Sequence, residues 1–438
     1  MKLQTQRFID RWVGQLLCSA VSAWVSFTGL FGAPAQLATA PKNILVILLS
    51  EMGSIVLAGP MFAQLRRQFP GAAIHILQLK KNQEVSKLLQ LTDPACMHSL
   101  DDSSGASLVS DILSISLKMR RLGLDAVIDC ELFSRVSALL SFSTGAPVRV
   151  GFTPHTQEGL YRGSFINHAI PYNPYQHISK QFLSLVDALQ SPHGMPRNRA
   201  GAIREIPTGP ELAVHFKPEE LLAYRDKVHA DHPVAKARKL VLVYAGGGIL
   251  PERAWPQAHY ARVVHGLCTA GHAVGLIGLK DDADLARSLI AQVRNMAPAT
   301  GSARTPEGVQ SSLGRPGERL DACVDLTGYT KSIRELLMLM HASSLLITND
   351  GGPSHFATVT PIQTMVFFGP ETGKLYGPLG KRTAILESGI ACSPCLTAYN
   401  HRLTFCDGDN QCLKRIAPDP VLDQALAFLT DSSPGAGA

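Results

Sequence analysis

The chain alternates short apolar runs with amphipathic segments, and turns rich in glycine, proline or serine separate most of them. The first apolar run covers residues 43–49; an amphipathic segment at 56–69 and a second apolar run at 73–77 follow it. This order of strand, turn, helix and strand is typical of βαβ units in a parallel sheet. The same order restarts at 240–244. The sequence therefore predicts two α/β units, each built on a parallel sheet.

The length of 438 residues suits two domains of roughly 150 to 200 residues each. We expect an apolar helix at 1–40, an N-terminal α/β domain at 41–205, a linker at 206–239, a C-terminal α/β domain at 240–430 and a loose tail at 431–438. Two such domains that face each other enclose a cleft where their strand ends meet, which is the usual place for ligands in open α/β sheets.

The composition argues against a nucleic-acid partner. Hydrophobic residues make up 45% of the chain and the net charge is only +6, a modest value for this length. Lysine and arginine are scattered, without a long basic run or the alternation of aromatic and basic residues that single-strand binders use. We therefore expect a globular protein without a nucleic-acid function.

The segment 348–369 predicts an anion site. The apolar run 345–347 is stopped by the turn residues at 349–353, and Ser354 is placed to cap a following helix. The backbone amides of Gly351, Gly352 and the first helical turn would then lack partners within the helix. An anion such as phosphate is the natural occupant of such a turn.

Four blocks together resemble glycosyltransferase family 9, the heptosyltransferases that build bacterial lipopolysaccharide cores. The blocks are 47–60, 246–256, 325–328 and 349–370, in family-like order and spacing. The resemblance implies the GT-B arrangement, two Rossmann-like domains facing a cleft, with the donor bound mainly by the C-terminal domain. It also implies transfer of a sugar, with a heptose expected, from a nucleotide-diphosphate donor such as ADP-heptose to a lipid-linked or lipopolysaccharide-core saccharide. No cofactor is obligatory in this scheme.

The alternatives to this enzyme are a binding protein and an oxidoreductase. A GT-B-like protein that has lost turnover would bind a nucleotide sugar or saccharide without transferring it. A nicotinamide-dependent oxidoreductase needs G-x-G-x-x-G after its first strand, and neither glycine loop fits that pattern.

The donor diphosphate is expected on two glycine loops and one arginine. The loop residues are Gly246, Gly247, Gly248, Gly351, Gly352 and Ser354. Arg253 occupies the place of a basic donor-site residue in the family, and a guanidinium can neutralise a diphosphate bidentately. The alternatives are tight turns that bind nothing and a surface arginine beside Trp255.

The resemblance assigns Asp350 to the donor sugar, whose hydroxyls a carboxylate can hold. An aspartate before two glycines also suits an Asx turn, and the two roles are compatible. His355 would lie in the first helical turn near the phosphates and can donate to them, although a histidine there is more often a packing residue. We keep His355 as a secondary candidate.

The catalytic base is less well defined. The family commonly has an acidic residue directly after the glycine of its N-terminal loop. That glycine is Gly53 in this chain, and Ser54 follows it. Glu51 lies three residues earlier on the same loop, so we nominate it as the base. Its alternatives are a solvated loop glutamate and a helix cap.

A cysteine-rich segment follows the second glycine loop. Cys392 and Cys395 form a C-x-x-C pair, and Cys406 and Cys412 follow, with His401 between them. A structural zinc, two disulfides and reduced thiols all remain open, because the later spacing does not match a second C-x-x-C pair.

The N-terminal segment suggests a membrane partner, because no charged residue lies between Arg11 and Lys42. On a helix, one stripe is polar and a second is apolar: Gln15, Ser19, Ser22 and Ser26 form the first, and Leu16, Ala20, Trp24 and Phe27 the second. The interpretations are a helix lying on the membrane, a spanning anchor at 12–33, a signal peptide cleaved near 38–40, and an ordinary buried helix. We favour peripheral attachment at the cytoplasmic face of the inner membrane, because Pro41 disfavours cleavage and sugar nucleotides are absent on the far side.

Overall fold

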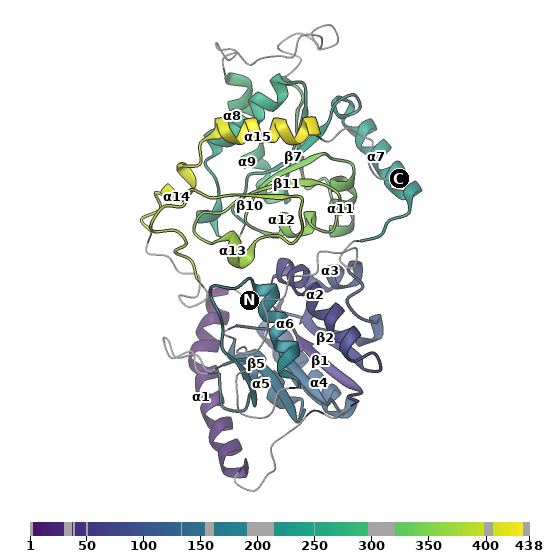
Figure 1. Ribbon diagram of the computed structural model, residues 1–438, viewed down its shortest axis with the longest axis vertical. Coiled ribbons are helices and arrows are strands. Elements are labelled where there is room, and N and C mark those ends of the chain that lie inside the picture. The colour runs from purple at the N-terminus through teal and green to yellow at the C-terminus, as the bar shows by residue number, and fades with distance from the viewer. Residues whose placement is uncertain are drawn as a thin grey trace. The chain divides into compact units, whose positions relative to one another are not determined.

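The computed structural model describes residues 3–29, 37, 40–49, 51–132, 134–153, 162–190, 214–248, 250–296, 320–397 and 406–431. Its helices and strands divide into two compact units, α1 to α6 in the first and α7 to α15 in the second (Figure 1). Each unit holds one six-stranded sheet. The predicted α/β architecture is confirmed at this level.

The first unit orders its strands β3-β2-β1-β4-β5-β6, and all neighbours pair in parallel. Its elements are α1 (Leu3–Gly29), β1 (Asn43–Ile47), α2 (Met52–Gln68), β2 (Ala73–Leu79), α3 (Gln83–Leu88), β3 (Met97–Leu100), α4 (Gly105–Leu122), β4 (Ala126–Asp129), α5 (Arg135–Ser143), β5 (Val148–Phe152), β6 (His168–Ile170) and α6 (Ile178–Ala188). The central strands are buried on both faces, which explains their continuous apolar runs.

The second unit repeats this topology, in the order β12-β11-β10-β7-β8-β9, again with parallel neighbours. Its elements are α7 (Pro218–Asp231), β7 (Leu240–Tyr244), α8 (Gln257–Thr269), β8 (Ala273–Gly278), α9 (Ala283–Asn295), β9 (Cys323–Thr327), α11 (Ile333–His341), β10 (Leu345–Asn349), α12 (Gly352–Ala357), β11 (Gln363–Phe367), α13 (Gly373–Tyr376), β12 (Thr383–Leu386), α14 (Gln411–Lys414) and α15 (Pro418–Asp431). The segment expected as a linker thus contains α7, and residues 432–438 of the expected tail lie outside the described part.

The strand order fixes where ligands can bind. In each sheet the chain winds outward in one direction and then restarts beside its first strand, so the order reverses between β1 and β4 and between β7 and β10. Open α/β sheets bind ligands at the carboxyl ends of the strands beside such a reversal. The loops after β7 and β10 are the two glycine loops singled out in the sequence.

The N-terminal helix differs from the expectation. It forms as α1 and packs on α5 within the first unit, with Cys18 in a small apolar cluster beside Ala138 and Phe165 (Figure 1). It is not apolar all round, since Asp10 and Ser22 face the body of the unit. Within the described residues, no helix combines the length and apolarity needed to cross a bilayer.

Candidate functional site

Asn349, the last residue of β10, joins the two glycine loops of the second unit. Its Nδ2 donates to the backbone oxygen of Gly246 over 2.9 Å. Its Oδ1 accepts from the backbone N–H of Trp255 and from the hydroxyl of Tyr260, each at 2.9 Å. One buried amide therefore holds the ends of β7 and β10 together, and the predicted loops do meet.

Arg253 lies in this same region and is bound by two carboxylates. Its Nε is 3.5 Å from Oδ2 of Asp350, and its guanidinium also contacts Glu371. The exposed fractions are 8% for Arg253, 7% for Asp350 and 3% for Glu371, so the cluster is almost wholly buried. The structure thus brings Arg253 and Asp350 together, but the guanidinium already has acidic partners. A role of Arg253 at the diphosphate stays a prediction.

The core of the unit fixes the turn that carries Arg253. The ring of Trp255 stacks on Phe367 with centroids 4.2 Å apart, and its Nε1 donates to the backbone oxygen of Ile416 over 3.1 Å. Trp255 is 1% exposed. A guanidinium two residues from such an anchor has little freedom to move, which favours a preorganised site.

The surroundings of the glycines differ between the two loops. A Cβ at Gly247 would lie 2.8 Å from the backbone oxygen of Leu250, and Gly248 has a positive φ of +62°. These two are required by the turn itself. A Cβ at Gly351 would meet nothing within 4 Å, so this backbone borders open space and is accessible to a ligand.

The start of the helix after β10 differs from the prediction. α12 begins at Gly352 with Gly351 in the cap position, and Ser354 lies inside the first turn. The hydroxyl of Ser354 donates to the backbone oxygen of Gly351 over 2.7 Å, so Ser354 caps no amide and the predicted cap is wrong. Proline at the second helical position made the earlier start feasible, because it needs no hydrogen-bond partner there. His355 is buried in α12.

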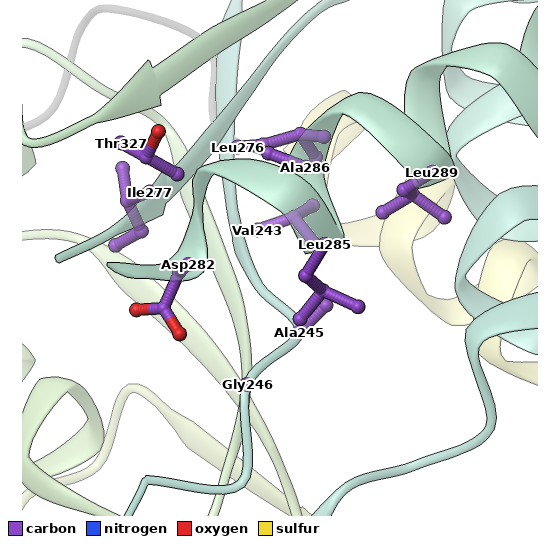
Figure 2. Close-up of a pocket in the computed structure, with 10 residues that line it drawn as sticks. All are labelled: Val243, Ala245, Gly246, Leu276, Ile277, Asp282, Leu285, Ala286, Leu289 and Thr327. Atoms are coloured by element: carbon purple, nitrogen blue, oxygen red, sulfur yellow. The ribbon is translucent and has the colours of Figure 1, made fainter. Parts of the chain in front are cut away.

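A small cavity of about 10 Å³ borders the first glycine loop, at the carboxyl ends of β7, β8 and β9 (Figure 2). Apolar side chains form most of its wall, and Gly246, Asp282 and Thr327 are also at its lining. The carboxylate of Asp282 accepts the backbone N–H of Leu279 over 2.8 Å. This volume suits about one water molecule, so the cavity itself cannot enclose a nucleoside.

Glu51 and Ser54, the two positions considered for the catalytic base, lie in the first unit, after the carboxyl end of β1. α2 begins at Met52 rather than at Val56, so Glu51 is in the cap position and Ser54 is in the first turn. The backbone N–H of Ser54 donates to the backbone oxygen of Glu51 over 2.9 Å. The side chain of Glu51 is exposed. The predicted start was too late because the glycine at 53 was taken for a turn residue.

Glu131 was missed from the sequence. It follows β4, and its Oε1 accepts the N–H of Leu49 over 2.7 Å, across the reversal between β1 and β4. A second carboxylate, which is half-buried, therefore lies beside the loop that carries the exposed Glu51. Its position depends on a pairing of residues 82 apart in sequence, which no local pattern could indicate.

Asp129 ends β4 just before this point and is bound by Arg162 and by the hydroxyl of Ser137. Both members of the ion pair are fully buried. Burial raises the pKa of Asp129 to about 6, against the opposing effect of Arg162. The ion pair of Asp129 and Arg162 lies next to the loop after β4 and helps to hold it in place. Because both side chains are fully buried, the pair is not accessible to substrate.

The cysteine segment forms no metal site in the described part of the chain, where no group of three or more His, Cys, Asp or Glu side chains is arranged to hold an ion. Cys392 and Cys406 are exposed, Cys395 is half-buried and Cys412 is buried. His401 and residues 398–405 lie outside the described residues. Zinc binding and disulfide formation remain predictions.

Two parallel sheets of one topology, with an open glycine turn at the reversal of the second, define a doubly wound α/β protein with Rossmann-like sheets. The sequence profile of glycosyltransferase family 9 (heptosyltransferase) matches residues 112–403, which is more than half of the chain. The chain therefore belongs to this family and is a glycosyltransferase, as the sequence predicted.

Relatives and solved structures agree with this assignment. The chain is 21% identical to lipopolysaccharide heptosyltransferase 2 of Salmonella typhimurium, with 89% of this chain and 99% of the relative covered. The fold is similar to that of ADP-heptose lipopolysaccharide heptosyltransferase II from Escherichia coli, with a TM-score of 0.62 at 18% identity, covering 89% of this chain and 99% of the other. It is also similar to an Escherichia coli heptosyltransferase solved with ADP, with a TM-score of 0.55 at 15% identity over 88% and 99% of the two chains.

Proposed function

We propose that this glycosyltransferase moves a heptose from ADP-heptose to a lipid-linked or lipopolysaccharide-core saccharide. The observation that carries the proposal is the open backbone at Gly351, beside the buried carboxylate of Asp350 and at the reversal of the second sheet. The names of the relatives and the ADP of one similar structure support the choice of donor.

The proposed reaction needs one bond exchange and one proton transfer. The acceptor oxygen attacks the anomeric carbon while the bond from that carbon to the diphosphate oxygen breaks, and the nucleoside diphosphate leaves. The acceptor proton passes to a carboxylate, for which Glu51 is the candidate. Backbone amides at Gly351 and Gly352 stabilise the charge on the departing diphosphate. These steps balance without a cofactor.

The two units act together in this proposal. The acceptor is bound by the first unit and the donor by the second. We place the enzyme at the cytoplasmic face of the inner membrane, because its proposed donor is a cytoplasmic nucleotide sugar and its acceptor carries a lipid.

A thermal-shift comparison tests the donor. ADP-heptose should raise the melting temperature more than ADP or other nucleotide sugars, because a ligand that binds only the native state stabilises it. Asp350→Ala should abolish the advantage of ADP-heptose over ADP and keep the shift with ADP. The exposed Asp321→Ala variant is the matched control. Failure of the wild type to respond to any nucleotide sugar would count against the proposal.

A protein that binds the donor but has lost turnover is favoured by one observation, the serine at position 54. Transfer assays on Glu51→Gln and Glu131→Gln separate the possibilities, since loss of a general base typically costs about 100-fold or more in rate. A large loss of transfer rate in Glu51→Gln alone supports our assignment, and a large loss in Glu131→Gln alone would assign the base to Glu131, after β4. Donor binding without turnover in the wild type would favour the binding protein.

A further inference from the structure

The N-terminal helix α1 is attached to the first unit by a stripe of small and polar residues. Asp10, Gly14, Cys18 and Ser22 recur at every fourth position and face the body of the unit. A Cβ added at Gly14 would lie 2.9 Å from the Cβ of Arg135, so the two helices approach closely there. At the far end, the Ser22 hydroxyl accepts the N–H of Ser164 over 3.0 Å. The helix is thus fixed to the unit from Asp10 to Ser22.

The opposite face of α1 is apolar and exposed. Leu16 is 73% exposed, Trp24 64% and Phe27 67%, and Trp12, Val13 and Leu17 are also about half exposed or more. The polar residues Gln15, Ser19 and Ser26 are exposed on one flank. The inner side holds a small apolar cluster around Cys18, but the larger apolar side chains face outward, whereas an ordinary surface helix turns its apolar side to the core. An apolar face of this kind on a soluble unit indicates a contact surface.

We infer that this outer face of α1 docks on a lipid surface, with the helix axis parallel to the membrane plane. The face carries no charge from Trp12 to Thr28, and its two tryptophans are roughly 18 Å apart along the axis, so both can lie at headgroup depth. At one end, the guanidinium of Arg11 lies 5.7 Å from the centre of the Trp12 ring, where it can meet anionic headgroups.

The attachment of α1 favours a flat lipid contact over insertion. The stripe from Asp10 to Ser22 stays bonded to the unit, so only the outer side chains are available to enter the layer. This inference deepens the proposed function, which already requires a lipid-linked acceptor. The docked helix holds the first unit, the proposed acceptor domain, next to that lipid. A second copy of the chain is the competing occupant.

Sedimentation of the full chain with vesicles tests the inference. Wild type should bind vesicles of phosphatidylcholine containing phosphatidylglycerol, and bind less well to phosphatidylcholine alone. The variant Leu16→Glu/Phe27→Glu should bind about a hundredfold more weakly, since each side chain loses its burial in the layer. The control Ser19→Glu/Ser26→Glu adds the same two charges on the polar flank and should stay close to wild type. Circular dichroism verifies that each variant is folded.

Three outcomes would overturn the inference. Wild type could remain in solution with both vesicles, or the two double variants could lose binding equally. Alternatively, size measurements without lipid could show a wild-type dimer that Leu16→Glu/Phe27→Glu converts to a monomer, which would assign the face to a second copy. The thermal shift with ADP-heptose is measured on the same samples. Vesicle binding without a thermal shift on ADP-heptose would contradict the proposed function alone. A thermal shift on ADP-heptose without vesicle binding would contradict the lipid contact alone.

Discussion

The Nε of Arg253 lies 3.5 Å from Oδ2 of Asp350, and the same guanidinium contacts Glu371. Removing one member of a buried ion pair leaves the others uncompensated. Arg253→Ala should therefore lower the free energy of unfolding by about 3 kcal/mol, measured by urea denaturation. Adding Glu371→Gln should recover part of that loss, because one stranded charge disappears.

A matched arginine provides the control for this prediction. Arg334 contacts Glu220 on the second unit's surface, where the side chains are 41% and 34% exposed. Arg334→Ala should cost at most about 1 kcal/mol, since solvent screens a partly exposed pair. Equal losses in the free energy of unfolding for Arg253→Ala and Arg334→Ala would show that the buried cluster stabilises the protein no more than an exposed ion pair does.

Asn349 gives a second prediction, which concerns the link between the two glycine loops. Asn349→Ala removes the acceptor of the Trp255 N–H and the donor to Gly246, so buried groups are left without partners. We expect a loss of about 2 to 3 kcal/mol in stability and weaker binding of ADP by thermal shift.

Tyr260→Phe is the comparison for the asparagine variant. It removes the hydroxyl that donates to Asn349 and lies 3.2 Å from the backbone oxygen of Tyr244, but leaves the amide of Asn349 in place, and should cost about 1 kcal/mol. If Tyr260→Phe lowered the free energy of unfolding as much as Asn349→Ala, the amide of Asn349 would not be the group that holds the two loops together.

The main strands could be predicted from the sequence, because a fully buried parallel strand needs a continuous apolar run and the runs at 43–49, 240–244 and 345–347 have that form. The glycine loops were located for the same reason, since they follow these runs directly. The resemblance to the family was seen in blocks that contain these loops.

The partners of the site residues could not be predicted. Glu371 lies 118 residues from Arg253, and a buried glutamate has no local pattern that distinguishes it from a surface one. The attachment of α1 to the first unit could not be predicted either. The period of its stripes was correct, but Asp10 and Ser22 bond to residues far away in the sequence, which no local pattern indicates.

The third prediction concerns acid stability and rests on a histidine pair in the first sheet. His75 Nδ1 is 3.2 Å from His98 Nε2, and Lys118 Nζ is 3.2 Å from His98 Nδ1. Burial, then Lys118 and His75, lower the pKa of His98 to about 4. The unfolded chain, with its histidine near pKa 6.5, then binds the proton more readily.

The sign of the effect follows from that difference. Stability from His98 is present above about pH 6.5 and is lost as the pH falls toward 4, by about 2 kcal/mol between pH 7 and 5. His98→Gln should remove most of this dependence in urea titrations, and the exposed His215→Gln should leave it unchanged. A pH dependence in His98→Gln identical to the wild type would contradict the assignment.

The last prediction concerns the attachment of α1 through Asp10. Its Oδ1 accepts the N–H groups of Arg135 and Val136, at 2.9 and 3.0 Å, in the first turn of α5. Asp10→Ala leaves these two amides without their acceptor, so we expect a loss of about 1 to 2 kcal/mol and faster hydrogen exchange throughout α1. Asp10→Asn keeps an acceptor oxygen, and because burial raises the pKa of Asp10, a neutral amide is tolerated there. The asparagine variant should therefore exchange like the wild type, and rapid exchange in both variants would mean that the charge, rather than the acceptor, holds the helix in place.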